Sequence, residues 1–334
     1  MKSGLLVLFF CGLFFSVGCI DGAGSNSSHS NTLADPSSPS TSPPTTLPVS
    51  AIYPAPNTSP NDLPKLFGYF ASAQSGVGTG NYISEMPGQA NYVFIRTHGS
   101  LVARLSEARA AHLKAVVSFS YLPYDETIMQ LRSDWQTRMQ ELFDIAQVNQ
   151  DIIVAFYIFD EPYSNALNKG VSDVDMYRSL DLVGNYLKAH FPAIPIAVIF
   201  SPTEVKRDVP LPASIDWFGI DCYEGFDNCE GLSIPAYFEK LDVRIRQMDA
   251  IDGKRRQLMA VPPTGFPQDL PNPEANRLQQ LAKYREWLRY RSDIHIIMGF
   301  LWQSFSEGWI GTRDSAPLRE GYTSLYQDFI SGNL

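Results

Sequence analysis

The chain has few of the residues that define several protein classes. It has four cysteines in 334 residues and no C-x-x-C pair, which excludes a disulfide scaffold and a zinc or thiol-redox module. It has 26 Lys and Arg residues and 35 Asp and Glu residues, which gives a net charge of -9. This charge and the lack of a basic cluster argue against a nucleic-acid partner. No metal-ligand cluster, phosphate loop or cofactor motif stands out, so we expect neither a metal nor a cofactor. A hydrophobic content of 44% is typical of an acidic globular protein with a real core.

The first twenty residues predict export. Lys2 precedes the almost wholly apolar stretch 5–17, which is too short to span a bilayer comfortably and is typical of a secretory signal peptide. The stretch ends with the letters SVGC at Cys19, which resemble the lipobox of bacterial lipoproteins, although Ser16 stands where Leu is usual. We expect a signal peptide over residues 1–18 and a lipid on Cys19 that anchors the protein to the bacterial cell envelope. The alternative is a plain secretory signal, with a secreted protein and an incidental Cys19.

Residues 19–60 are predicted to be a disordered tether. Ser, Thr, Pro and Asn fill most of this stretch, which contains no Lys or Arg. Such a composition cannot bury enough apolar surface to offset the entropy of the chain. We expect one globular domain over residues 61–334, which acts as a monomer and touches the membrane only through the anchor.

From about Leu63, short apolar runs alternate with amphipathic stretches. The predicted strands are Leu66–Phe70, Tyr92–Arg96, Ala115–Tyr121, Ile152–Phe159, Pro195–Phe200, Trp217–Asp221, Leu258–Pro262 and Ile294–Trp302. The predicted helices are 100–113, 133–148, 173–190, 234–250, 274–291 and 319–331. This alternation favours a parallel sheet with right-handed crossovers, and eight strands in about 270 residues predict a (β/α)8 TIM barrel. A doubly wound open sheet is the competitor, but the expected Gly-rich fingerprint after the first strand is missing.

The chemistry of a TIM barrel lies at the carboxyl ends of its strands. Here the fourth predicted strand runs directly into Asp160, Glu161 and Pro162. Desolvation and mutual repulsion should raise the pKa of at least one of these two carboxyl groups. A carboxyl group with a raised pKa can protonate a leaving oxygen, as glycoside hydrolysis requires. The alternative is that the tripeptide only starts the next helix.

The letters YIFDEP, which end at Pro162, resemble the strand-4 signature of the TIM-barrel glycoside hydrolases. In the largest clan of these enzymes, strand 4 ends Asn-Glu-Pro and its Glu is the acid/base. Strand 8 of that clan commonly ends in a Trp that floors the sugar site. The resemblance implies that Glu161 is the acid/base and that Trp302 is the stacking platform.

The sequence departs from that clan at two places. Residues 259–266, where the clan has its nucleophile, contain no carboxylate, and Asp160 replaces the Asn before the acid. An Asp-Glu pair is instead similar to β-N-acetylhexosaminidases, in which the Asp orients the substrate's acetamido group and the oxygen of that group attacks the anomeric carbon. A second carboxylate is another explanation, and Asp221 at the end of strand 6 is the best placed, before Glu224 and Glu307. The third explanation is a non-catalytic glycan-binding or cell-envelope protein.

Other strand ends carry polar and aromatic residues that could contact a sugar. The candidates besides Trp302 are Arg96, Tyr121, Tyr163, Tyr223, Phe266 and Trp309. Cys222 and Cys229 enclose six residues after strand 6, so an oxidising compartment would allow a disulfide there, with free thiols as the alternative. We therefore expect an exported glycosidase that acts on a poly- or oligosaccharide through Glu161, Asp160 and Asp221.

Overall fold

The computed structural model describes most of the predicted globular domain. The described residues are 63–70, 72–76, 79–97, 101–120, 122–269, 271–305 and 308–334. The predicted signal peptide, the anchor at Cys19 and the tether lie outside these residues. The same is true of Tyr121 and Glu307.

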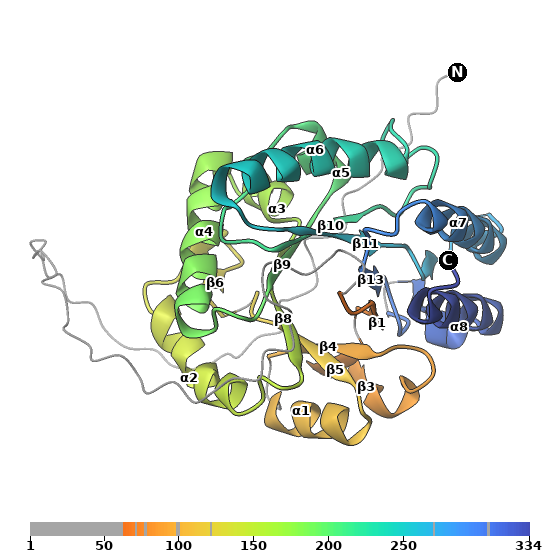
Figure 1. Ribbon diagram of the computed structural model, residues 1–334, viewed down its shortest axis with the longest axis horizontal. Helices are drawn as coiled ribbons and strands as arrows, with labels where there is room; N and C mark the ends of the chain where they lie inside the picture. Colours follow the sequence, from red (N-terminus) through yellow and green to blue (C-terminus); the bar gives the residue numbers. More distant parts are fainter. Residues whose placement is uncertain are drawn as a thin grey trace, which may run out of the picture. The chain divides into compact units, whose positions relative to one another are not determined.

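Eight parallel strands lie at the centre of the described domain, and helices surround them (Figure 1). The strands are β1 (Leu66–Tyr69), β4 (Tyr92–Arg96), β5 (Lys114–Ser118), β8 (Ile153–Asp160), β9 (Ile196–Phe200), β10 (Trp217–Asp221), β11 (Gln257–Val261) and β13 (Ile296–Gly299). Each pairs in parallel with the next from β4 to β13, and β13 pairs with β1. All eight strands overlap the predicted ones, and β4 and β10 have the predicted bounds.

Asn91 joins β1 to β4 and so nearly closes the ring. The backbone N–H of Asn91 donates to the carbonyl of Phe67 at 3.0 Å, and Asn91 Oδ1 accepts the N–H of Phe67 at 2.8 Å. The side-chain amide of Asn91 thus takes the place of a backbone carbonyl in the hydrogen bonding between β1 and the start of β4. The predicted TIM barrel is confirmed.

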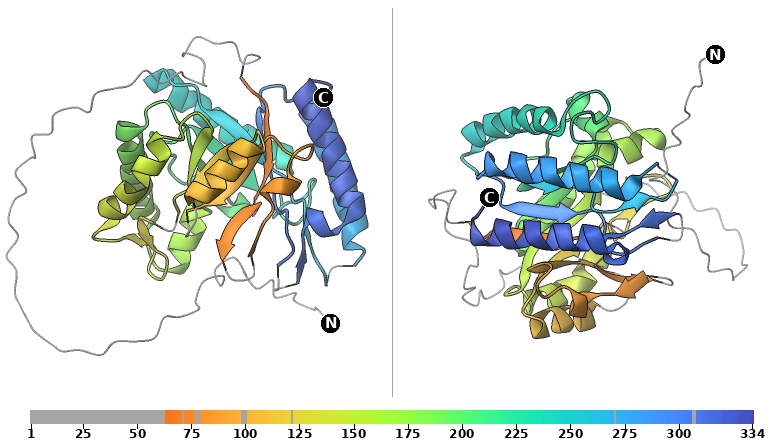
Figure 2. Two further views of the ribbon diagram at one scale, coloured as in Figure 1. Left: turned by 90° about the horizontal axis from the view of Figure 1, so that it is seen from below. Right: turned by 90° about the vertical axis from the view of Figure 1, so that its right-hand side faces the viewer.

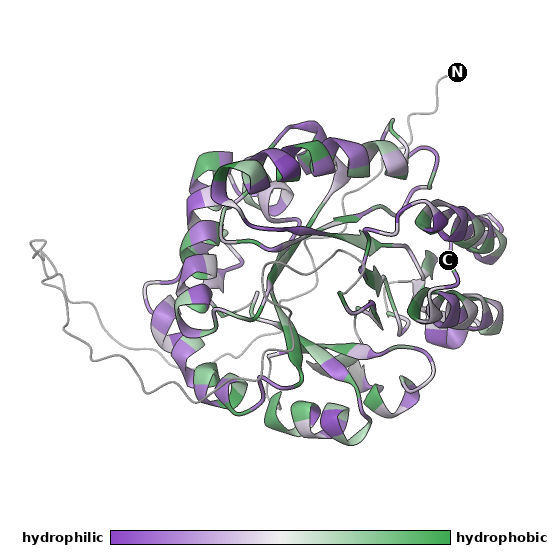
Figure 3. Ribbon diagram, viewed as in Figure 1, coloured by the Kyte–Doolittle hydropathy of each residue, from purple (hydrophilic) through white to green (hydrophobic). Residues whose placement is uncertain are grey.

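The strands are mostly apolar, with polar residues near their ends, because both of their faces are buried. One cluster, which includes Phe94, Tyr157 and Met259, fills the inside of the barrel. A larger cluster lies between the strands and the helices. Figure 3 shows the result, with apolar strands at the centre and helices that carry polar residues around them.

Six helices match the predicted ones. They are α1 (Leu101–Ala110), α2 (Trp135–Gln147), α4 (Asp173–His190), α6 (Ile234–Asp252), α7 (Pro273–Arg289) and α8 (Ala316–Ser331). The last two pack side by side (Figure 2). None of the helices within the described ranges combines the length and apolar character needed to cross a membrane.

Several short elements were not predicted. They are the hairpin of β2 (Ala73–Gly76) and β3 (Thr79–Asn81), the helices α3 (Pro162–Asn168) and α5 (Pro202–Lys206), the pairs β6 (Tyr124–Asp125) with β7 (Gln130–Leu131) and β12 (Phe266–Pro267) with β14 (Trp309–Ile310), and the 3-10 turns at Ile83–Glu85 and Thr312–Asp314. Most of them follow the carboxyl end of a barrel strand. They therefore shape the end of the barrel at which Asp160 and Asp221 lie.

Candidate active site

Glu161 lies at a sharp turn between β8 and α3. Its backbone is left-handed, with φ 45° and ψ 54°, and its N–H donates to the carbonyl of Ile199 on β9 at 2.9 Å. Pro162 starts α3 directly after it. A left-handed backbone costs a residue with a side chain about 1–3 kcal/mol, and such strain is concentrated at functional sites. The turn leaves the Glu161 side chain partly exposed at the barrel mouth.

Three carboxyl groups gather at the ends of β8 and β10. Burial raises the pKa of Glu161 well above its ordinary value, and the charges of Asp221 and then Asp160 raise it further. Burial also raises the pKa of Asp221 strongly, and the Asp160 charge adds to this rise. Asp160 ends β8, Glu161 follows it and Asp221 ends β10, so the three residues that the sequence proposed as catalytic lie at the same end of the barrel.

Asp160 and Glu161 have opposite surroundings. Tyr157 Oη donates to Asp160 Oδ1 at 2.7 Å. Burial raises the pKa of Asp160, but this hydrogen bond and the charge of Arg96 both oppose the rise. The charged neighbours that act most strongly on Glu161 are all carboxylates, so they favour its neutral form. The surroundings of Glu161 therefore favour its protonated form more strongly than the surroundings of Asp160 do.

Asp221 offers a second carboxylate. Its side chain is only 2% exposed, and Tyr223 Oη donates to its Oδ2 at 2.6 Å. Its other oxygen, Oδ1, has no hydrogen-bond partner within the described residues. A buried oxygen without a partner is costly, so it is a natural contact for a bound group.

A wall of aromatic rings lies beside these carboxyl groups. Phe300 follows the end of β13, is partly exposed and packs on the apolar inside of the barrel. Its ring centroid lies 4.7 Å from that of Tyr223, 5.5 Å from Phe70 and 5.7 Å from Trp309. Arg96, at the end of β4, lies 5.5 Å from the Phe70 ring. Tyr223, Trp309 and Arg96 thus lie beside this wall or in it, whereas Phe300 was not among the predicted sugar contacts.

Three other predicted sugar contacts are buried. Trp302 is 1% exposed and packs on Tyr69 at 4.9 Å, Tyr163 is fully buried and donates its hydroxyl to the carbonyl of Pro210, and Phe266 is 7% exposed. All three rings belong to the cluster between strands and helices. The stacking role predicted for them does not fit these positions. For Trp302 the reason is that β13 ends at Gly299, earlier than predicted.

Three further acidic residues were not predicted, and two of them, Glu204 and Glu230, act on Glu161. Glu204 is fully buried, and burial raises its pKa to about 7. Burial likewise raises the pKa of Glu126 to about 7 against the charges of Arg96 and Arg132. Glu230 adds to the rise in the pKa of Glu161. Only Glu204 had a sequence signal, because Ser201 and Glu204 have the spacing of a capping box and do form one.

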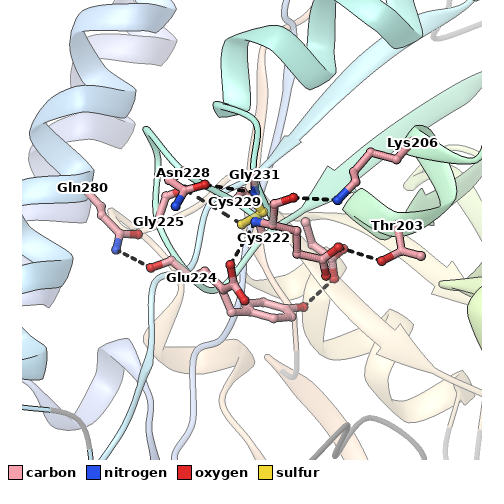
Figure 4. The surroundings of a disulfide bond; sticks show 12 residues. Thr203, Lys206, Cys222, Glu224, Gly225, Asn228, Cys229, Gly231 and Gln280 are labelled. Carbon is pink, nitrogen blue, oxygen red and sulfur yellow. Dashed lines mark hydrogen bonds between the residues drawn. A yellow bond between two sulfur atoms is a disulfide. The ribbon is translucent and has the colours of Figure 1, made fainter. Parts of the chain in front are cut away.

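The predicted disulfide between Cys222 and Cys229 is present, with Cα atoms 6.2 Å apart (Figure 4). It closes the loop that follows Asp221. Among the residues that the structure describes, no three His, Cys, Asp or Glu side chains are arranged to hold a metal ion. A cavity of about 620 Å³ lies at the opposite end of the barrel, where residues such as Leu66, Trp217 and Ile296 start their strands. It contains none of the three carboxyl groups.

Comparison with protein-family models finds no match, and comparison with curated proteins finds none. Solved structures share the fold. A glucosidase from Croceicoccus marinus matches with a TM-score of 0.54 and 9% identity over 80% of this chain and 68% of its own. A β-mannanase from the blue mussel Mytilus edulis has a TM-score of 0.51 and 11% identity over 79% and 92%. A Bacteroides uniformis β-glucuronidase has a TM-score of 0.55 and 12% identity over 78% of this chain, which spans only 34% of that protein. At such identities the likeness shows the fold alone, a TIM barrel of the kind that glycoside hydrolases have.

Proposed function

We propose that this protein is a glycoside hydrolase that cleaves O-glycosidic bonds in a poly- or oligosaccharide. One observation carries the proposal. Glu161, Asp160 and Asp221 meet at the carboxyl ends of β8 and β10, and the pKa of Glu161 is raised by burial and by the other two charges. A neutral carboxyl group next to an ionised one is the arrangement that acid-catalysed glycoside cleavage needs. The fold shared with glycosidases supports the same activity.

In this reaction Glu161 donates its proton to the glycosidic oxygen while the bond from that oxygen to the anomeric carbon breaks. Positive charge then develops on the sugar ring. Asp221 stabilises this charge in its ionised form, which the hydrogen bond from Tyr223 favours, either by attack of Oδ1 on the anomeric carbon or by taking a proton from a water that attacks there. Tyr223 fixes the direction of Asp221 by donating to its Oδ2. If a covalent intermediate forms, water hydrolyses it while the ionised Glu161 takes up the proton of that water.

A substrate-assisted route is the second mechanism. Asp160, held by the hydroxyl of Tyr157, would orient the acetamido group of an N-acetylated sugar, whose oxygen would attack the anomeric carbon. The two routes predict different variants to fail. Asp221→Asn loses most activity if Asp221 is the second carboxylate. Asp160→Asn loses most activity, and only N-acetylated sugars are cut, if the substrate assists.

We also propose that the enzyme is exported and held at the bacterial cell envelope by a lipid on Cys19. The apolar stretch 5–17 and the small residues before Cys19 support this location. The Ser-, Thr- and Pro-rich stretch up to residue 60 would let the barrel reach substrate away from the membrane surface.

The experiment that tests the activity is release of reducing ends from a panel of polysaccharides and N-acetylhexosamine oligomers. The full chain is compared with Glu161→Gln and with the control Glu286→Gln, which changes an exposed carboxylate on α7. Loss of the general acid should lower kcat by about 10²–10⁴-fold, and the control should keep full activity. Full activity in Glu161→Gln would refute the assigned site. Binding of glycans without any turnover would instead indicate a non-catalytic glycan-binding protein.

A further inference from the structure

A second, smaller cavity lies beside the proposed active site. Its volume is about 300 Å³, and it lies between the disulfide loop and the first half of α7. Glu224 and Asn228 line it from the loop, and Asn276, Arg277, Gln279 and Gln280 line it from the helix. The loop follows the carboxyl end of β10, and α7 follows β11 and β12. The cavity is therefore at the same end of the barrel as Glu161.

Tyr223 connects this cavity to the catalytic carboxylates. Its hydroxyl donates to Asp221 Oδ2 at 2.6 Å, and its main-chain carbonyl accepts from Arg277 Nη2 at 2.7 Å. Arg277 is 2% exposed and also donates to Gln280 Oε1 at 2.9 Å. Tyr223 thus contacts Arg277 in the lining of the cavity and also orients the carboxyl group of Asp221.

The disulfide loop gives the cavity a fixed wall. Figure 4 shows Gln280 on one side of this loop, directed to Glu224, and Thr203 and Lys206 on the other. Gln280 Nε2 donates to the Glu224 carbonyl at 3.4 Å, while Lys206 Nζ donates to the Glu230 carbonyl at 2.6 Å. The Cys222–Cys229 bond closes the loop that contains Glu224, and Glu230 follows this loop directly. A wall held in this way loses little entropy when a ligand binds.

The chemistry of the cavity suits an uncharged sugar. Asn228, Asn276, Gln279 and Gln280 bring amide groups, which both donate and accept hydrogen bonds as sugar hydroxyls do. The charges of the lining residues sum to zero, because the two negative charges of Glu224 and Asp227 are balanced by the two positive charges of Arg277 and Lys283. Lys283 also forms an ion pair with Asp227. A balanced lining of this kind favours a neutral saccharide over a uronate or a sulfated sugar.

We propose that this cavity is a second saccharide subsite, which binds a neutral sugar unit of the same substrate whose glycosidic bond lies at Glu161. The inference rests on the proposed glycosidase activity and extends it. The substrate is then a neutral oligo- or polysaccharide that runs from Glu161 past Tyr223 to α7, and longer chains are better substrates than short ones.

The test is the dependence of kcat/KM on chain length, measured with the full chain and neutral oligomers of increasing length. The double variant Asn276→Ala/Gln279→Ala changes two exposed amides of α7 outside the catalytic groups. We expect it to lower kcat/KM for the longest oligomers by about 5–50-fold, as the loss of one or two hydrogen bonds implies, and to leave the shortest cleaved oligomer unaffected. The control Gln327→Ala removes an exposed amide on the neighbouring helix α8. It should leave kcat/KM unchanged for both the longest and the shortest oligomers.

A calorimetric measurement separates failure of this inference from failure of the proposed function. Full-length Glu161→Gln is titrated with neutral glucose, mannose and N-acetylglucosamine oligomers, with and without the Asn276→Ala/Gln279→Ala changes. The subsite is supported if affinity increases with chain length and if this increase disappears in the variant that also carries Asn276→Ala and Gln279→Ala. This conclusion holds even if no glycan is cut. The proposed subsite is overturned if the double variant loses the same affinity for short and long oligomers. It is also overturned if neither the affinity nor kcat/KM depends on chain length.

Discussion

Glu161 and Asp160 are neighbours in the sequence but have different electrostatic roles. Tyr157 and Arg96 stabilise the ionised form of Asp160, whereas the strongest charged neighbours of Glu161 disfavour its ionised form. The sequence predicted that one carboxyl group of the pair would hold a proton. It could not say which, because most of the charged groups that decide come from other elements, namely β4, β10 and α5. A sequence also does not show on which side of the barrel wall a ring lies beyond the end of a strand. For this reason it predicts Trp302 rather than Phe300 as the stacking platform.

The raised pKa of Glu161 predicts a measurable effect on stability. In an unfolded chain a glutamic acid ionises near pH 4.3. In the folded protein Glu161 keeps its proton to higher pH, so the unfolded state binds fewer protons between these two pKa values. The free energy of unfolding therefore falls as pH rises through this window, and the neutral variant Glu161→Gln escapes that loss.

We expect Glu161→Gln and the wild type to unfold at similar temperatures near pH 4, with the variant a few degrees more stable near pH 8. One kcal/mol corresponds to roughly 2–4 °C for domains of 150–250 residues. The measurement is thermal unfolding by circular dichroism from pH 4 to 8, with Glu286→Gln as the control. A difference that does not change with pH would show that Glu161 is not held neutral.

At the scale of elements, the long strands and helices were predictable and the short ones were not. Strands such as β10 and helices such as α4 have apolar patterns that span their whole length. The helices α3 and α5 have seven and five residues, too few for a periodic pattern, and they exist because their starts are capped. Glu204 does this for both, since its Oε1 accepts the N–H of Ser164 and its Oε2 accepts the N–H of Ser201, each at 2.7 Å.

Glu204→Ala should therefore destabilise the protein and reduce its activity. Each buried N–H left without a partner costs about 1–3 kcal/mol, and Ser164 lies on α3, the helix that starts directly after Glu161. Urea unfolding should show a loss of this size, while Glu239→Ala, an exposed Glu on α6, should change stability by less than about 0.5 kcal/mol. Stability equal to that of the control would mean that water replaces the carboxylate at both helix starts.

At the scale of the whole molecule, the eightfold alternation was enough to predict the barrel. The count of strand and helix units and the apolar strands, buried on both faces, leave few other topologies. The loops at the mouth were much less predictable, because β6, β7, β12 and β14 have only two residues each. The second cavity was not predicted at all, since it forms between a loop and a helix that are about 50 residues apart in the sequence.

The remaining prediction concerns the location of the whole chain. If Cys19 carries a lipid, a bacterial host that expresses the full chain should retain it in the membrane fraction, and mild detergent should release it. Cys19→Ala removes the only thiol that the motif can use, so this variant should move to the soluble or aqueous-extract fraction with unchanged glycan turnover. The control Cys11→Ala changes a cysteine inside the apolar stretch 5–17 and should remain membrane-bound. Equal fractionation of the wild type and Cys19→Ala would show that the stretch 5–17 is a plain secretory signal or retains the chain by itself. If the chain is exported on this tether, it can reach polymers too large to enter the cell, and such polymers are long enough to occupy both Glu161 and the proposed second subsite.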